Sequence, residues 1–128
     1  MKTINVVAAI IYEGDKILAT QRGYGDFKGK WEFPGGKIES GETSEKALKR
    51  EIYEELNAKI SIEKYICTIE YDYSNFHLSM QCYMCSLLDG KIELKEHINA
   101  KWITREELYQ LDWLPADVKL VECLIKNI

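Results

Sequence analysis

Three glutamates in the middle of the chain, Glu51, Glu54 and Glu55, are the residues whose types and spacing most clearly suggest chemistry. They lie in residues 43–56, where apolar side chains recur every four residues, as on the buried face of a helix. At about 100° per residue, the three carboxylates fall within one sector of that helix, beside the apolar stripe. Like charges at this spacing repel one another, more so when partly buried. The pattern therefore predicts a bound cation, and oxygen ligands of this kind suit Mg²⁺.

A solvated acidic face is the alternative explanation of the same residues. Arg50 precedes Glu54 by one helical turn, so the two side chains can form an ordinary surface ion pair. Many glutamate-rich helices carry such pairs without any catalytic role. The helix taken alone leaves the metal site and the solvated face open.

The elements expected before and within this helix bring it against a sheet. They are, in chain order, strands at 6–12 and 16–21 joined by a hairpin turn at 13–15, a glycine-rich loop at 22–30, an extended segment at 31–33, a turn at 34–36 and the helix at 43–56. Thr43 or Ser44 can cap the start of the helix, and Asn57 tolerates the left-handed conformation that often ends one.

The elements expected after the helix complete the sheet and add a second helix. They are strands at 62–73 and 76–88, a turn at 89–90, strands at 91–94 and 100–103, a short helix from a capping box at 104–107 to about residue 111, and a final helix at 115–127 with Val118, Val121, Leu124 and Ile125 facing inward. The order predicts an α+β fold, in which a mixed β-sheet is flanked by a central and a C-terminal helix.

The stretch from Gly36 to Ala58, GKIESGETSEKALKREIYEELNA, resembles the signature of the Nudix hydrolases. Its one departure is Asn57, where the family usually has glycine, and asparagine adopts the same left-handed geometry. The resemblance implies the family's α/β/α sandwich as a single domain over residues 1–128. It also implies hydrolysis of a nucleoside diphosphate linked to another group, with Mg²⁺ or Mn²⁺ as the metal.

Carried over by position, the resemblance implies that Glu51, Glu54, Glu55 and the carbonyl of Gly35 bind the metal. Arg50 then orients Glu51 through a salt bridge. The residue that accepts the proton of the attacking water varies among relatives, and two of the metal ligands, Glu51 and Glu54, are candidates for that role.

Glu96 is a third candidate for the general base. It lies six residues before Trp102, as a loop glutamate does in the most similar subfamily. The alternative is that Glu96 is a plain loop acid beside His97.

The resemblance extends over nearly the whole chain to MutT-type enzymes and bacterial CTP pyrophosphohydrolases. The shared stretches are VVAAII (6–11), QR (21–22), WEFPGGKIE (31–39), WI with an acidic helix after it (102–107) and LPAD (114–117). Both groups convert a nucleoside triphosphate to a monophosphate and pyrophosphate. The expected substrate is therefore 8-oxo-dGTP, which the first group prefers, or (d)CTP and modified cytosine nucleotides, which the second prefers.

Asp117 matches the position that reads the base, which is asparagine in typical MutT enzymes and aspartate in the cytosine-preferring relatives. An ionised aspartate only accepts hydrogen bonds, which suits an exocyclic amino group, whereas a protonated one can also donate. The alternative is that Asp117 only favours the first turn of the final helix through the helix dipole.

Four further residues are expected at the substrate. Arg22 matches a phosphate- or sugar-contacting arginine, and Glu32 and Phe33 lie where relatives line the nucleotide pocket. Phe76 stands where MutT enzymes carry arginine, so a stacking role there or at Tyr73 competes with simple packing. A solvated arginine and a core phenylalanine are the alternatives for Arg22 and Phe33.

Composition narrows the classes of partner. The 128 residues carry a net charge of −4, so broad attraction to nucleic acid polymers or to anionic membranes is not expected. No apolar stretch has membrane-spanning length and no signal-peptide cleavage site is visible, which predicts a cytoplasmic protein, as a monomer or weak homodimer. Cys82 and Cys85 form a C-x-x-C without a second pair, so buried thiols are expected rather than a zinc or redox site.

The competing class of function is a non-catalytic nucleotide-binding or regulatory module, since some Nudix domains have become sensors. Such domains often lose glutamates from the signature, and this chain retains all of them. Turnover of a triphosphate is the observation that separates the two classes.

Overall fold

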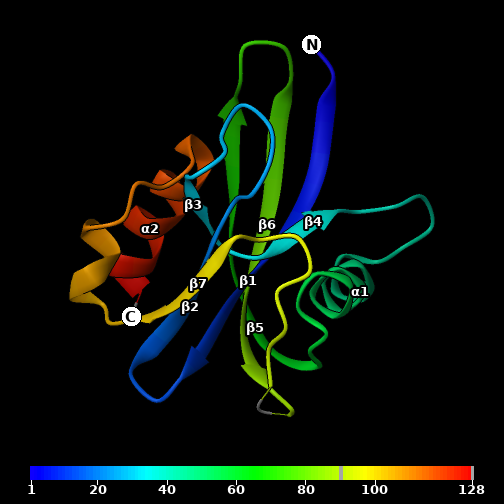
Figure 1. Cartoon of the computed structure of the whole chain (residues 1–128). Helices are drawn as coiled ribbons and strands as arrows, with labels where there is room; N and C mark the ends of the chain where they lie inside the picture. Colours follow the sequence, from blue (N-terminus) through cyan, green and yellow to red (C-terminus); the bar gives the residue numbers. More distant parts are fainter. Residues whose placement is uncertain (90, 128) are drawn as a thin grey trace.

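The structure is a computed structural model that describes residues 1–89 and 91–127 (Figure 1). In chain order the elements are β1 (Thr3–Glu13), β2 (Lys16–Gln21), β3 (Trp31–Glu32), β4 (Gly35–Lys37), α1 (Ser44–Leu56), β5 (Ile60–Asp72), β6 (His77–Leu87), β7 (Asn99–Ile103), the 3₁₀ helix η1 (Glu106–Tyr109) and α2 (Pro115–Asn127). The hairpin of β1 and β2, the helices at 43–56 and 115–127, and the strands near 62–73, 76–88 and 100–103 are confirmed, with ends that shift by a few residues at most.

Strand β1 organises the sheet because it pairs with three other strands. Its residues Thr3 to Ile11 run parallel to β6, Val6 to Ala8 pair antiparallel with β4, and its last two residues pair antiparallel with β2. Strand β5 extends the sheet beyond β6, and β3 and β7 pair with opposite edges of β2. The sheet is therefore mixed, as predicted.

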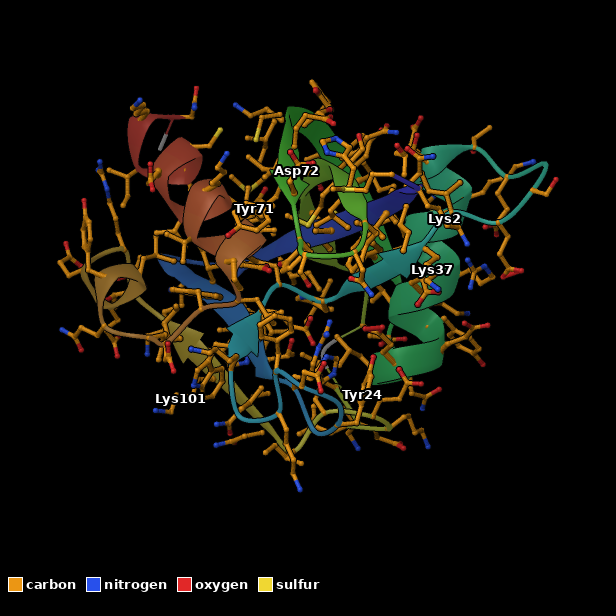
Figure 2. The ribbon with its side chains drawn as sticks, turned by 90° about the horizontal axis from the view of Figure 1, so that it is seen from above. Lys2, Tyr24, Lys37, Tyr71, Asp72 and Lys101 are labelled. Carbon is orange, nitrogen blue, oxygen red and sulfur yellow. The ribbon has the colours of Figure 1, made fainter. Side chains whose placement is uncertain are left out.

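Two hydrophobic clusters form on the two faces of this sheet. Alternating side chains of β1 contribute to each: Ala8 and Ile10 join the cluster under α2, and Val7, Ala9 and Ile11 join the cluster under α1. In Figures 1 and 2 the sheet lies between the two helices, with Tyr71 on the side of α2 and Lys37 on the side of α1. The layers are those of an α/β/α sandwich, which confirms the expected fold class.

Helix α1 begins and ends where its sequence predicts. The Thr43 side chain accepts a hydrogen bond from the Lys46 amide, and Asn57 adopts the left-handed conformation with φ 51° and ψ 37°. The stripe of Leu48, Ile52 and Leu56 is fully buried against the sheet. The substitution of asparagine for the family's glycine therefore keeps the helix end intact.

The turn expected at residues 34–36 is wrong in part, because Gly35 and Gly36 belong to strand β4. Only Pro34 lies in a bend. A Cβ atom on Gly35 would overlap the carbonyl oxygen of Val7, so the backbone of β4 approaches β1 more closely than any side chain allows. The glycine at position 35, which suggested a turn, is instead what allows this close approach.

The strand expected at residues 91–94 is also wrong. These residues form an irregular segment whose amides are used elsewhere: Glu93 N–H donates to Leu56 O and Lys95 N–H donates to Glu55 O. The segment thereby satisfies carbonyls at the end of α1 that have no partner within the helix. Gly90, half of the expected turn at 89–90, lies outside the described residues.

The C-terminal region differs from expectation in two details. The capping-box segment opens only the 3₁₀ helix η1, where Glu107 accepts a hydrogen bond from the Thr104 amide. On α2, Val121 and Leu124 are buried as predicted and Ile125 is half-buried, but Val118 is exposed. No helix among residues 1–89 and 91–127 has both the length and the apolar character needed to cross a membrane.

Cys82 and Cys85 are buried free thiols on opposite faces of β6, one in each hydrophobic cluster. Burial raises the pKa of Cys85 to about 12. The interpretation of this pair as small buried side chains is confirmed.

The close approach of β4 to β1 predicts the effect of a single methyl group. Gly35→Ala places a Cβ where the Val7 carbonyl lies, so we expect the free energy of unfolding to fall by about 1–3 kcal/mol, as in overpacked cores. Urea denaturation measures this loss. Lys37→Ala, which truncates an exposed side chain of the same strand, should change it by less than about 0.5 kcal/mol. Equal losses in the two variants would contradict the close approach.

Candidate active site

The three glutamates of α1 lie in different environments, because the helix turns each one toward a different neighbour. Glu55 is buried, with 6% of its surface exposed, and Glu51 is half-buried. Glu54 is exposed and faces Arg50. The structure therefore brings Glu51 and Glu55 together and leaves Glu54 at the edge.

Glu55 carries a buried oxygen with no hydrogen-bond partner among the described residues, Oε1. Burial, together with the nearby carboxylates of Glu51, Glu32 and Glu96, raises the pKa of Glu55 to about 9, against a smaller opposing effect of the Gly35 amide. Burial also raises the pKa of Glu51. This concentration of negative charge in a poorly solvated place is costly unless a cation offsets it.

Arg50 holds the surrounding carboxylates in place. Its Nη1 donates to Glu51 Oε1 at 2.9 Å and to Glu54 Oε1 at 3.0 Å, while Nε donates to Glu42 Oε2 at 2.7 Å. Its Nη2 donates to the Lys37 carbonyl at 3.0 Å, which ties α1 to β4. The expected salt bridge between Arg50 and Glu51 is present.

The glycine pair of β4 lies on one side of the acidic group of α1, which consists of Glu51, Glu54 and Glu55. A Cβ on Gly36 would overlap the carboxylate of Glu51, so a larger residue there would displace that carboxylate. Gly35 and Gly36 also line a pocket, described below. The strand therefore separates the acidic group from a pocket by the thickness of one backbone.

The residues present fit a hard divalent cation. The partnerless buried oxygen of Glu55, the neighbouring carboxyl of Glu51 and the all-oxygen donor set are what such an ion requires. Within residues 1–89 and 91–127, no three carboxylate, imidazole or thiol groups are already arranged as a complete metal site. Glu54 would have to leave Arg50 to become a third carboxylate ligand.

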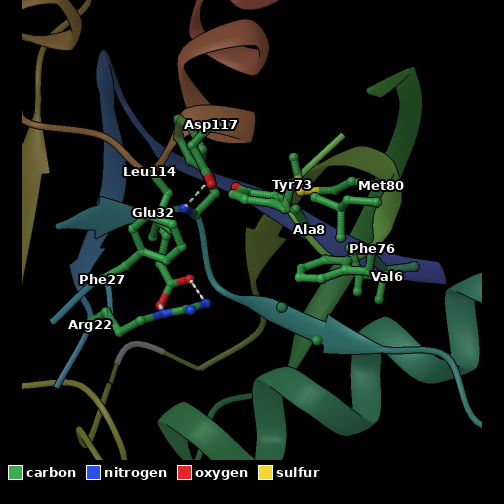
Figure 3. A pocket seen from close by; sticks show the side chains of 15 residues that line it. Val6, Ala8, Arg22, Phe27, Glu32, Tyr73, Phe76, Met80, Leu114 and Asp117 are labelled. Carbon is green, nitrogen blue, oxygen red and sulfur yellow. Dashed lines mark hydrogen bonds and ion pairs between the residues drawn. The ribbon is translucent and has the colours of Figure 1, made fainter. Parts of the chain in front are cut away.

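A pocket lies on the other side of β4, between β1, β3, β6 and the first turn of α2 (Figure 3). All five predicted substrate residues and both glycines line it: Arg22, Glu32, Phe33, Phe76 and Asp117, with Gly35 and Gly36. Residues from six separate segments thus meet at one site, as the sequence predicted for a nucleotide pocket.

Asp117 is buried at the start of α2 and points into the pocket. Its Oδ1 accepts a hydrogen bond of 3.0 Å from the Phe33 amide. Burial raises the pKa of Asp117 to about 8, with Glu32 adding to the effect and the Phe33 hydrogen bond opposing it. A side chain placed only to favour the helix dipole would remain in solvent, so the pocket role gains support over that alternative.

Arg22 and Glu32 form an ion pair at the end of the pocket opposite Phe76 (Figure 3). Arg22 Nη2 donates to Glu32 Oε1 at 2.7 Å and Nε donates to Oε2 at 3.3 Å. Two of the guanidinium donors expected for phosphate are therefore committed to Glu32. His97 also contacts this carboxylate, with 3.3 Å between Nε2 and Glu32 Oε2.

Aromatic rings form the remaining wall of the pocket. Tyr73 stacks on Phe76 with 5.1 Å between ring centroids, and Phe27 meets Tyr73 edge-on at 5.7 Å. Phe33 is almost fully buried and stacks on Trp113 at 4.6 Å, so it serves both the core and the pocket. Such rings can sandwich a planar base.

Two residues of this site, Phe27 and His97, were not assigned a role from the sequence. Phe27 lies in the glycine-rich loop and His97 in the irregular segment before β7, where no periodic pattern indicates which way a side chain points. Glu96, the third candidate base, is exposed on the same segment, close enough to Glu55 to contribute to its raised pKa. For His97, the only indication in the sequence was that it is adjacent to Glu96, which was itself a candidate base.

Comparison with known proteins agrees with this geometry. The NUDIX domain family model matches residues 1–123, so the chain belongs to the Nudix hydrolase family, whose members generally use a divalent metal. The CTP pyrophosphohydrolase of Escherichia coli strain K12 is 36% identical over 126 residues, which cover 98% of this chain and 93% of that protein. The 8-oxo-dGTP diphosphatase of Haemophilus influenzae is 34% identical over 128 residues, covering 98% and 94%. The solution structure of the Escherichia coli ORF135 protein has a TM-score of 0.85 and 36% identity, covering 98% and 91%.

The crowding of carboxylates at Glu55 predicts opposite effects of one substitution on stability and on activity. At pH 7.5 the pKa of about 9 keeps Glu55 protonated in the metal-free folded protein, so folding must bind a proton that the unfolded chain releases. Glu55→Gln keeps the shape of the side chain and removes this cost, so in EDTA at pH 7.5 the variant should unfold at a higher urea concentration than the unmodified protein. Added Mg²⁺ should stabilise the unmodified protein, by about 2.7 kcal/mol at one hundred times its Kd, and should leave the variant unchanged. Turnover should fall about 100-fold or more, as on loss of a group that stabilises transition-state charge.

Glu122→Gln is the matched control, since Glu122 is exposed on α2. It should change neither the urea midpoint in EDTA nor the response to Mg²⁺. A Glu55→Gln variant that gains the same stability from Mg²⁺ as the unmodified protein would contradict the metal assignment.

Proposed function

We propose that this Nudix hydrolase is a nucleoside triphosphate pyrophosphohydrolase, which releases a nucleoside monophosphate and pyrophosphate. The observation that carries the proposal is the arrangement around β4. A pocket with polar and aromatic walls lies on one side of two glycines, and the acidic group of α1 lies on the other. A nucleotide whose base occupies the pocket can thus extend its phosphates toward the acidic group. The printed activities of the two relatives, CTP pyrophosphohydrolase and 8-oxo-dGTP diphosphatase, support the same reaction.

Glu51, Glu54, Glu55 and the Gly35 carbonyl would hold Mg²⁺, or Mn²⁺ in its place. Such a metal neutralises phosphate oxygens and makes a bound water a better nucleophile. The partnerless oxygen of Glu55 and the contact between Glu51 and Gly36 support this ligand set. Glu54 joins it once released from Arg50, whose remaining bonds to Glu42 and Lys37 keep the guanidinium in place.

Among the three candidates for the general base, Glu51 is the best supported. Burial raises its pKa, and Arg50 fixes its orientation. Glu54 and Glu96 are exposed. Glu51 therefore receives the proton of the attacking water in this proposal.

The base-recognising groups are Glu32 and Asp117. Hydrogen bonds from His97 and Arg22 outweigh the effect of burial and lower the pKa of Glu32, so it is an acceptor only. The raised pKa of Asp117 lets its carboxyl group donate as well as accept. An acceptor, Glu32, next to a group that can both donate and accept, Asp117, suits a base with an amino group next to a ring acceptor. Cytosine has this arrangement, and 8-oxoguanine has it on another edge.

A panel of triphosphates tests the reaction. Incubation of the protein with CTP, dCTP, UTP, ATP, GTP and 8-oxo-dGTP in Mg²⁺, with ion-exchange analysis of the products, should yield monophosphate and pyrophosphate. The fastest turnover is expected for a cytosine nucleotide or for 8-oxo-dGTP. EDTA should stop the reaction. Release of no pyrophosphate from any triphosphate would refute the proposal, and tight metal-independent binding without turnover would favour the regulatory module instead.

Asp117→Asn tests the reading of the base. Since the Phe33 amide occupies one oxygen, the asparagine must direct its NH₂ group to the position of the other oxygen. At pH 9, above the pKa of about 8, that oxygen of Asp117 accepts, so the asparagine replaces an acceptor by a donor and opposes an amino group on the base. The ratio of kcat/KM for dCTP over dUTP, or for 8-oxo-dGTP over 8-oxo-dITP, should fall about tenfold or more. Asp112→Asn, which alters an exposed ion pair with Lys30, is the control and should leave both ratios unchanged. Unchanged ratios in Asp117→Asn would exclude contact with the base.

A further inference from the structure

His97 is a nearly fully buried polar side chain, only 5% exposed, whose contact with Glu32 the proposed reaction does not use. Its Nε2 is 3.3 Å from Glu32 Oε2, and its Nδ1 is buried with no hydrogen-bond partner among the described residues. A ring nitrogen that faces a carboxylate must carry the hydrogen to form a bond, so we assign the hydrogen to Nε2. Nδ1 then carries no hydrogen, so no unpaired N–H is buried there.

The backbone around His97 is anchored on both sides. Lys95 N–H donates to Glu55 O at 3.0 Å, and Ile98 N–H donates to Gln21 O at 3.0 Å. A Cβ atom on Gly23 would come within 2.9 Å of both Glu96 O and a methyl group of Ile98, so the segment packs directly on a glycine. The imidazole is therefore held at a fixed distance from Glu32 and does not reach it by chance.

Two side chains contact the Glu32 carboxylate from different directions. Arg22 contacts both of its oxygens from within the pocket lining, and His97 contacts Oε2 from a segment that does not line the pocket. The Glu32 side chain is 13% exposed, which leaves one edge of the carboxylate for a ligand. Arg22 lies close to Oε1, at 2.7 Å, but is 3.3 Å from Oε2, so the contact of His97 with Oε2 adds a second restraint on the orientation of the carboxylate.

We infer that His97 is a positioning residue: it fixes the Glu32 carboxylate in the orientation that recognises the amino group of the nucleotide base. This inference rests on the proposed function, because it concerns how the same pocket selects its substrate. His97 touches neither the base nor the phosphates and acts through Glu32. Its loss should weaken discrimination between bases without slowing the chemical step.

Two variants separate the hydrogen bond from the packing. His97→Leu keeps an apolar side chain of similar size and removes the donor, whereas His97→Gln keeps an N–H near the position of Nε2. Isothermal titration in EDTA measures the Kd of dCMP against dUMP, and of 8-oxo-dGMP against 8-oxo-dIMP, without any metal or turnover. His97→Leu should reduce the preference for the amino-bearing member of the preferred pair about tenfold, and His97→Gln should restore it to within about threefold.

A double-mutant cycle with Glu32→Gln shows whether the effect passes through Glu32. In that background His97→Leu should change the Kd ratio by less than twofold. Lys95→Ala, an exposed change in the same segment, should leave the ratio as it is. Thermal unfolding of each variant identifies any loss of the fold, and if His97→Leu does not fold, an unchanged ratio in Glu32→Gln alone refutes the inference.

The outcomes keep this inference apart from the proposed function. If the protein hydrolyses no triphosphate but His97→Leu reduces the preference for the amino-bearing monophosphate, the proposed reaction is wrong and the role of His97 stands. If hydrolysis occurs while His97→Leu binds both members of each pair as the unmodified protein does, the reaction stands and the role of His97 is refuted. Failure of the unmodified protein to prefer either amino-bearing monophosphate also refutes it. With turnover, KM should rise in His97→Leu and kcat should stay within about twofold.

Discussion

Strand β4 passes between β1 and α1 at a place where neither neighbour leaves room for a side chain. Gly35 lies against the carbonyl of Val7, and Gly36 lies against the carboxylate of Glu51. This double contact fixes the distance between the sheet and the acidic helix, and with it the distance between the pocket and the acidic group. A side chain at Gly35 would push β4 away from β1, and one at Gly36 would displace the Glu51 carboxylate. The rest of the site is arranged around this contact, because the pocket and the carboxylates share the same two residues as a wall.

The carboxylates of the site differ in how well they are paired with other groups of the protein, and Glu55 is the least well paired. Arg50 holds Glu51, and Arg22 with His97 holds Glu32, so these carboxylates have partners within the protein. Glu55 has a buried oxygen with none. A protein that buries a carboxylate in this way gives up stability, and enzymes commonly accept that cost where an ion or substrate completes the site. The position of the missing partner agrees with the family's general use of a divalent metal.

Local patterns in the sequence predicted the helix and the hairpin well, because caps, periodicity and turn residues act over a few positions. Helix α1 and its end at Asn57 are of this kind. Strand β4 was mistaken for a turn since its glycines serve a contact with Val7, far away in the chain. Likewise, the pairing of His97 with Glu32 depends on the path of an irregular segment, and no periodic pattern of side chains in the sequence predicts that path. The glutamates and Asp117 could be proposed from resemblance, but their burial and partners needed the fold.

The parallel pairing of β1 with β6 sets the order in which this chain can fold during synthesis. Thr3 is opposite His77, 74 residues further along. At 5–20 residues per second the ribosome needs roughly 4–15 s to make that length. For that time the apolar centre of β1 lacks its principal partner and has only the hairpin with β2 and the short contact with β4. Non-local pairing of this kind slows folding and leaves a strand edge exposed to other chains. The nascent protein is therefore most prone to aggregate before β6 has emerged.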